Sequence, residues 1–263
     1  MAKSATKSPQ FRCTECGWTT GKWAGRCGEC QSWGCVEEVG VVTATTKARA
    51  TTTPALAISS IDITSAASAS TGISEFDRAL GGGFVPGAVL LLAGEPGVGK
   101  STLLLAVAAQ WAQLGHKVLY LTGEESAAQV RIRAERISAL SDSLFLAAET
   151  DLGVALGHIE ETNPSLLIVD SVQTISSSDI EGVGGGVTQV KEVAATLIRA
   201  AKSRNMTTVL VGHVTKDGSV AGPRALEHLV DVVLSFEGDR HGPLRLVRAI
   251  KNRYGPADEI GCF

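Results

Sequence analysis

One segment of nine residues constrains the fold of this chain more than any other part of its sequence. Residues 94–102 read GEPGVGKST, which matches the pattern GxxxxGK[ST], and they follow directly on the apolar segment AVLLLAG at residues 88–94. A loop of this kind between a strand and a helix surrounds phosphate oxygens with backbone N–H groups at the helix N-terminus. The expected nucleotide-binding residues are Gly94, Glu95, Pro96, Gly97, Val98, Gly99, Lys100, Ser101 and Thr102.

The residue types in and around this loop predict a site for ATP and Mg²⁺. Lys100 is expected to reach the β- and γ-phosphates, and the Ser101 hydroxyl is expected to bind Mg²⁺. Asp170 ends the apolar segment SLLIVD at residues 165–170, where a carboxylate can hold the metal side of such a site. We therefore expect Ser101 and Asp170 to bind magnesium and Lys100 to act in catalysis.

Two further strand ends carry candidates for the hydrolysis step. Glu124 and Glu125 follow the apolar segment KVLYLTG, and we expect Glu124 to be the general base, with Glu125 as the alternate. The same acidic pair would also suit a helix N-terminus without any catalytic role. His213 lies near the end of TTVLVGHV, where it is either a γ-phosphate sensor or a histidine with structural hydrogen bonds only.

Short apolar segments alternate with amphipathic helical segments from residue 71 onward. Apolar segments that are continuous, each followed by a helix, are typical of a mostly parallel sheet covered on both faces. The sequence therefore predicts an α/β fold. The expected strands cover residues 88–94, 117–123, 143–148, 165–170, 207–214 and 231–238, and the expected helices cover 102–115, 127–140, 152–162 and 187–205.

The N-terminal segment carries a separate signal for metal binding. Two CxxC pairs with ten residues between them offer four thiolates, the tetrahedral set that structural Zn²⁺ prefers: Cys13, Cys16, Cys27 and Cys30. Two disulfides are the less favoured alternative, because no export signal precedes them. A segment of this size buries too little to fold alone, so zinc should supply its folding free energy. Cys35 and Cys262 are expected to be free cysteines.

Composition narrows the class of protein. Hydrophobic residues make up 44% of the 263 residues and the net charge is −3, which excludes both a disordered chain and a strongly basic protein that coats nucleic acid. The first 35 residues carry five Lys or Arg against two Glu, a local net charge of +3. Neither a secretory signal nor a membrane span is visible, so we expect a cytoplasmic protein without a membrane partner.

These observations divide the chain into three parts. We expect a zinc ribbon at residues 1–36, a flexible linker rich in Ala, Thr and Ser at residues 37–70, and one ATPase domain at residues 71–263. The tryptophans of the ribbon either pack its small core or stack on nucleic acid.

The combination of motifs resembles the bacterial RadA/Sms family of RecA-like DNA-repair ATPases. The resemblance rests on the four-cysteine ribbon and on five further segments, TGISEFDRALGGGFVPGAVLLLAGEPGVGKST, YLTGEES, IVDSVQT, GHVTKDGSVAGPRALEH and KNRYGPADEIG. The last segment corresponds to a KNRFG signature of that family, with Tyr in place of Phe. Its residues here are Lys251, Asn252, Arg253, Tyr254 and Gly255.

The resemblance implies a RecA-like core that works as a hexameric ring. It implies a DNA-dependent ATPase that binds single-stranded or branched DNA and drives branch migration or unwinding alongside the RecA recombinase. Lys251 and Arg253 would lie near a subunit boundary and act on the γ-phosphate of a neighbouring subunit or couple nucleotide to DNA. Members of the family continue into a C-terminal domain resembling the Lon protease fold, and we expect that domain to be absent from this chain.

Two loops are expected to bind DNA by analogy with RecA-like proteins. The first, residues 176–191, is rich in glycine and ends at Lys191, although it also carries acidic residues. The second, residues 215–228, contains Lys216 and Arg224. Lysine and arginine in such loops would bind DNA phosphates independently of the base sequence.

Two other functions are alternatives to a DNA-dependent ATPase. One is a RecA-like ATPase of the KaiC kind that acts on a protein, and the other is a zinc-tethered adaptor with a vestigial ATPase.

Overall fold

The computed structural model describes residues 11–38, 55–213, 225–238 and 242–263. The chain forms two compact units, Met1–Ile61 and Asp62–Phe263.

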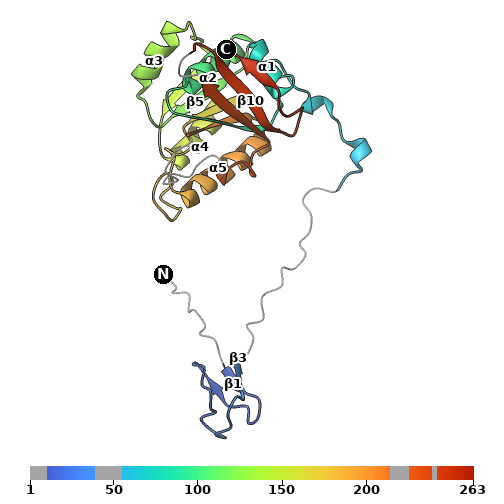
Figure 1. The fold of residues 1–263 in the computed structure, drawn as a ribbon, viewed down its shortest axis with the longest axis vertical. Helices are drawn as coiled ribbons and strands as arrows, with labels where there is room; N and C mark the ends of the chain where they lie inside the picture. Colours follow the sequence, from blue (N-terminus) through green and yellow to red (C-terminus); the bar gives the residue numbers. More distant parts are fainter. Residues whose placement is uncertain (1–10, 39–54, 214–224, 239–241) are drawn as a thin grey trace. The chain divides into compact units, whose positions relative to one another are not determined.

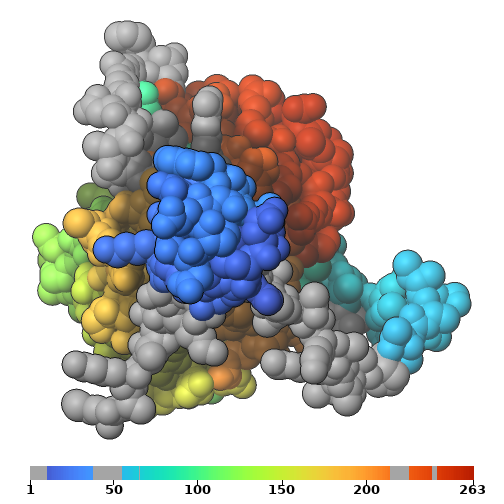
Figure 2. Space-filling model, turned by 90° about the horizontal axis from the view of Figure 1, so that it is seen from below, coloured from blue at the N-terminus to red at the C-terminus, as the bar shows by residue number. Residues whose placement is uncertain are grey.

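The small unit is a three-stranded antiparallel sheet around a very small core. Strands β1 (Phe11–Cys13), β2 (Thr19–Thr20) and β3 (Val36–Glu38) are arranged in the order β2-β1-β3. Figure 2 shows this unit in blue as a tight lobe. Its buried apolar residues are Cys13, Cys27, Cys35 and Val36, with Phe11 and Trp18 packed against them. So few buried side chains cannot stabilise a fold without a cross-link or a metal.

Trp18 explains one glycine of the ribbon. A Cβ at Gly28 would lie 2.9 Å from Cζ2 of the Trp18 indole, so any larger residue would push this ring out of the core. The other two tryptophans of the unit, Trp23 and Trp33, are 69% and 76% exposed, and Arg26 lies over the Trp33 ring. Of the three, Trp18 is therefore the tryptophan that packs the ribbon.

The large unit is built on an eight-stranded sheet. Its strands run in the order β11-β10-β9-β4-β8-β7-β5-β6. The six strands from β9 to β6 in this order are parallel to one another, while β10 pairs antiparallel with both β9 and β11. The strands are β4 (Val89–Gly94), β5 (Val118–Thr122), β6 (Leu144–Ala148), β7 (Leu166–Asp170), β8 (Thr207–His213), β9 (Val232–Gly238), β10 (Arg245–Asn252) and β11 (Ile260–Cys262).

Helices cover both faces of this sheet (Figure 1). They are α1 (Ser74–Leu80), α2 (Lys100–Gln113), α3 (Ala127–Arg136), α4 (Leu152–Thr162) and α5 (Val187–Arg204). Successive residues of a strand point to opposite faces. Leu90 and Leu92 of β4 accordingly pack with α1, α2 and α3, whereas Val89 and Leu91 pack with α4 and α5. The predicted fold class, a mostly parallel sheet covered on both faces and preceded by a four-cysteine ribbon, is confirmed.

Several short elements were not predicted from the sequence. Helix α1 has only seven residues, and the antiparallel pair β10 and β11 has no helix between its strands to produce the α/β pattern. Two 3-10 turns, Ile58–Ser60 and Thr64–Ala66, lie in the segment predicted as linker, and Ala69 pairs with Phe84. Within the described ranges, no helix combines the length and the apolar character needed to cross a membrane.

Parallel alignment brings the carboxyl ends of the central strands to one edge of the sheet. Gly94 of β4 is the register partner of His213 in β8, and Thr122 of β5 is the partner of Asp170 in β7. The segments that follow these strands therefore start at one edge, where ligands bind in open α/β sheets.

A buried carboxylate ties together the opposite edge. Asp231, which is 4% exposed, directly precedes β9. Its Oδ2 accepts hydrogen bonds from the Val89 backbone N–H (3.0 Å) and from Lys202 Nζ (2.5 Å), while its Oδ1 accepts one from Arg253 (3.1 Å). One side chain thus joins the starts of β4 and β9, the last turns of α5 and the residue after β10.

We predict that Asp231→Ala lowers the free energy of unfolding by about 3 kcal/mol, because it leaves a buried N–H and two cations without their acceptor. Chemical denaturation of both proteins measures the difference. The control is Glu160→Gln, which breaks the exposed ion pair with Arg204 and should cost less than about 1 kcal/mol. Equal losses in the two variants would contradict the role given to Asp231.

The same pair of proteins tests the pH dependence. The pKa of Asp231 is lowered because the hydrogen bonds from Lys202 and Val89 N–H and the nearby positive charges outweigh burial, which acts in the opposite direction. A carboxylate with a lowered folded-state pKa stabilises the fold above its unfolded pKa, and this contribution is lost as pH falls. The difference in the free energy of unfolding between wild type and Asp231→Ala should thus be constant above about pH 5 and shrink below about pH 4.

Candidate nucleotide site and metal centre

The phosphate loop is formed at the end of the central strand β4. Gly97 and Gly99 have φ angles of +79° and +110°, which side-chain-bearing residues rarely adopt. A Cβ at Gly94 would lie 2.4 Å from the Phe236 carbonyl oxygen, so a larger residue there would displace β9. Glycine is thus required at each of the three positions by the backbone.

Lys100 begins helix α2 and turns back into the loop. Its Nζ donates hydrogen bonds to the carbonyl oxygens of Gly94 (3.0 Å) and Glu95 (2.8 Å), and the residue is 3% exposed. Burial lowers the pKa of Lys100, while the charges of Asp170 and Glu124 oppose this shift. A cation held inside a glycine loop at a helix N-terminus fits the phosphates of a nucleotide. Ser101 and Thr102 follow in the first turn of α2.

Asp170 lies at the end of β7 and is 7% exposed. The hydroxyl of Tyr120, a fully buried residue of β5, donates a hydrogen bond of 2.6 Å to Asp170 Oδ2. Burial and the neighbouring Asp170 charge raise the pKa of Tyr120, which therefore stays a hydrogen-bond donor. A buried carboxylate beside the phosphate loop is the ligand type that Mg²⁺ takes in such sites, so the residues fit the expected cation.

The two candidate bases are separated by their contacts. Glu124 Oε1 accepts a hydrogen bond of 2.7 Å from Ser171 Oγ and lies 3.0 Å from His213 Nε2. Glu125 instead forms an ion pair with Arg133 of α3. The fold therefore brings Glu124, Asp170 and His213 together and directs Glu125 toward a helix.

His213, the last residue of β8, also contacts Gln173. The Gln173 side-chain amide donates to the His213 carbonyl oxygen at 3.4 Å. Within the described residues, Gln173 Oε1 and His213 Nδ1 are buried without a hydrogen-bond partner. Gln173 and Ser171 were missed by the sequence analysis, although both lie within three residues of Asp170.

Arg245 was also not assigned to the nucleotide site from sequence. It begins β10, and its Nε donates a hydrogen bond of 3.2 Å to the Val98 carbonyl oxygen in the phosphate loop. The signal available in the sequence is the cluster of basic residues near the C-terminus to which it belongs: Arg240, Arg245, Arg248, Lys251 and Arg253.

The four cysteines of the small unit lie together with the spacing of a zinc site. Their sulfur atoms are all within 4.8 Å of one another, with Cys13–Cys30 at 3.7 Å and Cys16–Cys27 at 3.6 Å. A tetrahedral Zn²⁺ with Zn–S bonds of about 2.3 Å requires S–S separations of about 3.8 Å, so the set fits the ion. Hydrogen bonds from the Cys16 backbone N–H and the Cys35 thiol lower the pKa of Cys13 despite burial, whereas the neighbouring cysteines of the cluster raise the pKa of Cys16.

Comparison with known proteins supports both sites. Residues 59–219, more than half of the chain, match the family model described as AAA domain, and residues 11–38 match the model described as Rubredoxin metal binding domain. The protein called DNA repair protein RadA in Mycolicibacterium smegmatis is 56% identical over 274 residues, which cover 100% of this chain and 59% of that protein. The chain belongs to the RadA family.

Two other relatives carry the same name. DNA repair protein RadA of Mycobacterium tuberculosis strain H37Rv is 56% identical, over 98% of this chain and 55% of the relative. That of Streptococcus pyogenes serotype M1 is 48% identical, over 98% and 58%. The chain thus spans a little over half the length of the curated relatives it matches. None of these three is named for action on a protein, so the KaiC-like alternative is not supported.

The KNRYG segment of this RadA family member does not lie at the phosphate loop of the same chain. Asn252 pairs with Val232 at the start of β9, whereas the phosphate loop follows the end of the neighbouring strand β4. Lys251 Nζ donates to the carbonyl oxygens of Glu227 and Val230, both at 2.8 Å, and Arg253 binds Asp231. Asn252 donates to the Leu80 carbonyl oxygen, and Gly255 packs against Gly81. Within a single chain, the contacts of this segment therefore stabilise the fold.

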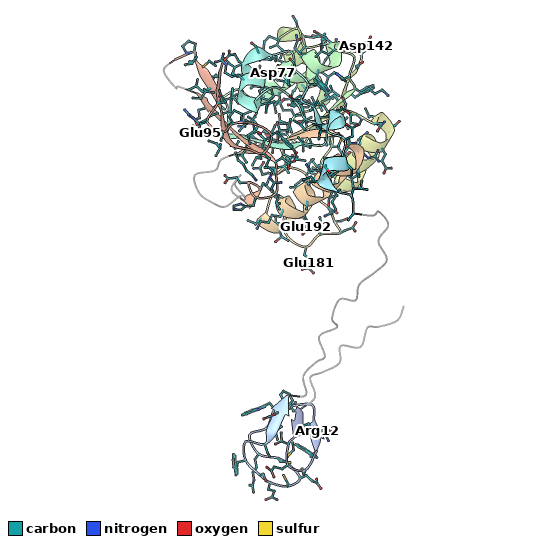
Figure 3. All side chains as sticks on the ribbon, turned by 90° about the vertical axis from the view of Figure 1, so that its right-hand side faces the viewer. Arg12, Asp77, Glu95, Asp142, Glu181 and Glu192 are labelled. Atoms are coloured by element: carbon teal, nitrogen blue, oxygen red, sulfur yellow. The ribbon has the colours of Figure 1, made fainter. Side chains whose placement is uncertain are left out.

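The two predicted DNA loops are described to different extents. Gln189 is buried and fastens the first loop by hydrogen bonds with the backbone of Ser177 and with the Ile180 carbonyl oxygen. Lys191 is exposed one turn into α5. Figure 3 shows Glu181 of the first loop and Glu192 of α5 at the same end of the large unit. Lys216 and Arg224 of the second loop lie outside the described residues.

We predict that Cys27→Ser releases zinc and unfolds the ribbon while nucleotide binding by the large unit persists, because the two units have separate cores. Zinc content and binding of a fluorescent ATP analogue measure the two effects. Cys262→Ser, which removes an exposed cysteine from β11, should retain zinc. Loss of nucleotide binding in Cys27→Ser would mean that the units do not fold independently.

Proposed function

We propose that this chain is a Mg²⁺-dependent ATPase whose hydrolysis is coupled to DNA in recombinational repair. The observation that carries the proposal is the convergence of Lys100, Asp170 and Glu124 at one sheet edge, with Glu124 held by Ser171 and His213. The names of the relatives, which are DNA repair proteins, support the choice of DNA as the partner.

The residues of the site have distinct roles in this proposal. Bound MgATP supplies the phosphoryl group and the cation that neutralises its developing charge. Residues 94–102 hold the phosphates, with Lys100 at the β- and γ-phosphates, and Ser101 and Asp170 hold the cation. Glu124 Oε1 contacts Ser171 and His213, and among the described residues Oε2 has no hydrogen-bond partner, so Oε2 is the oxygen proposed to orient water and take its proton.

His213 is the proposed link between nucleotide and DNA. Its ring meets Glu124, and its carbonyl oxygen is bound by Gln173 immediately before the loop that carries Lys216 and Arg224. Lys191, Lys216 and Arg224 are the proposed contacts to phosphates of single-stranded or branched DNA. DNA bound by these residues would act on His213 and, through its ring, on Glu124.

The position of Lys251 and Arg253 supports assembly of several copies. Both lie at the sheet edge away from their own phosphate loop, so any action on a γ-phosphate requires the loop of another subunit. We also propose that the protein forms a hexamer, acts with RecA and is cytoplasmic. The proposed division of the chain is a ribbon (1–36), a linker (37–70) and an ATPase domain (71–263).

We predict that wild-type protein hydrolyses ATP in the presence of Mg²⁺ and faster with single-stranded DNA. Lys100→Ala should lose at least about 100-fold in turnover, because the phosphates lose a buried cation. Phosphate release with and without an oligonucleotide measures both effects. Turnover that DNA leaves unchanged, together with no DNA binding, would contradict coupling to DNA and favour a protein substrate.

The two adjacent glutamates give a matched pair of variants. Glu124→Gln should lower turnover by at least about 100-fold while ATP still binds, because the amide cannot accept the proton of water. Glu125→Gln weakens only the ion pair with Arg133 and should lower turnover far less. The reverse order of effects would make Glu125 the base.

A further inference from the structure

Strands β5 and β7 exchange two hydrogen bonds between hydroxyls and carboxylates. Tyr120 of β5 donates to Asp170 at the end of β7, at 2.6 Å. Ser171, which follows β7, donates to Glu124, which follows β5, at 2.7 Å. Each strand thus provides one acid of the proposed ATPase site and the hydroxyl that holds the acid of the other strand.

Tyr120 is placed for this contact by the sheet itself. It is the register partner of Ile168, two residues before Asp170, and the residue is 1% exposed. Its ring lies in the core that β5 shares with α2 and α3, where a phenylalanine would fill the same space. The hydroxyl is what distinguishes tyrosine here. Asp170 Oδ2 is its one hydrogen-bond acceptor among the described residues.

The two carboxylate oxygens of Asp170 differ in their contacts. Oδ2 is occupied by Tyr120, while Oδ1 accepts no hydrogen bond within the part of the chain that is described. A hydrogen bond to a ligating carboxylate fixes its orientation, and loss of such a partner typically weakens metal affinity by about 10- to 100-fold. The other donors near this edge, Ser171 and His213, are directed to Glu124.

We propose that Tyr120 is a positioning residue for magnesium, which holds Asp170 so that Oδ1 faces the cation of the bound nucleotide. This inference rests on the proposed ATPase function. It assigns to Tyr120 a role in metal affinity and to Ser171 a role in orienting Glu124.

The test is Tyr120→Phe, which keeps the ring and removes the hydroxyl. Mn²⁺ binding is measured by electron paramagnetic resonance in the presence of a non-hydrolysable ATP analogue. We expect affinity for Mn²⁺ to fall about 10-fold. The Mg²⁺ concentration for half-maximal ATP turnover should rise by the same factor, with turnover largely recovered at saturating Mg²⁺. Binding of the nucleotide in EDTA should be unchanged.

The control is Ser165→Ala, directly before β7, which removes a hydroxyl that accepts a hydrogen bond from Trp111 Nε1 at 3.0 Å and donates one to the Lys117 carbonyl oxygen at 3.2 Å. If Tyr120→Phe acted only by lowering stability, both variants would be less stable and the affinity for Mn²⁺ would be unchanged in both. Unchanged Mn²⁺ affinity in folded Tyr120→Phe overturns the inference, provided the wild type binds the ion. Failure of the wild type to bind Mn²⁺ with nucleotide would overturn the ATPase proposal as well.

A second measurement needs no variant at position 120. The chain contains two tyrosines, so incorporation of 3-fluorotyrosine gives two fluorine resonances, and Tyr254→Phe assigns them. Addition of Mg²⁺ to the nucleotide-bound protein should shift the Tyr120 resonance. A Tyr120 resonance that does not respond to the cation overturns the inference.

Discussion

The parallel alignment of the buried central strands is the constraint on which the rest of the large unit depends. Strands β4, β5 and β7 are buried along their whole length, so each must be paired on both sides and covered on both faces. Helices α1, α2 and α3 cover one face of the sheet, and α4 and α5 cover the other. Because these strands point the same way, the polar residues that follow them start at one edge. The site is a consequence of that direction.

Both edges of the sheet bury charge, and they satisfy it differently. At the edge opposite the nucleotide site, Asp231 has three donors from three different segments, which makes it a structural junction. At the nucleotide edge, Lys100 is bound only to the loop carbonyl oxygens of Gly94 and Glu95 among the described residues. Carbonyl oxygens are weaker partners for an ammonium than phosphate is. Such an arrangement is suited to a ligand that brings negative charge.

The ribbon is stabilised differently from the large unit. Its buried core consists of three cysteines and one valine, with Phe11 and Trp18 alongside, so the metal must provide much of its stability. Trp23 and Trp33 add little to that core because they are exposed. Packing of the small core is therefore seen for Trp18 alone, and stacking of the exposed Trp23 and Trp33 on nucleic acid stays a prediction.

Much of this protein was determined by local sequence alone. The phosphate loop, the two CxxC pairs and the alternation of apolar strands with helices are contiguous patterns, because backbone conformation and periodicity are written in neighbouring residues. The choice between Glu124 and Glu125 and the pairing of Tyr120 with Asp170 depend on which side chains meet across strands. So does the place of Lys251 and Arg253 away from their own loop. Only the tertiary structure decided these, because strand order and register bring together residues that are far apart in the chain, such as Tyr120 and Asp170 at 50 positions and Glu124 and His213 at 89 positions.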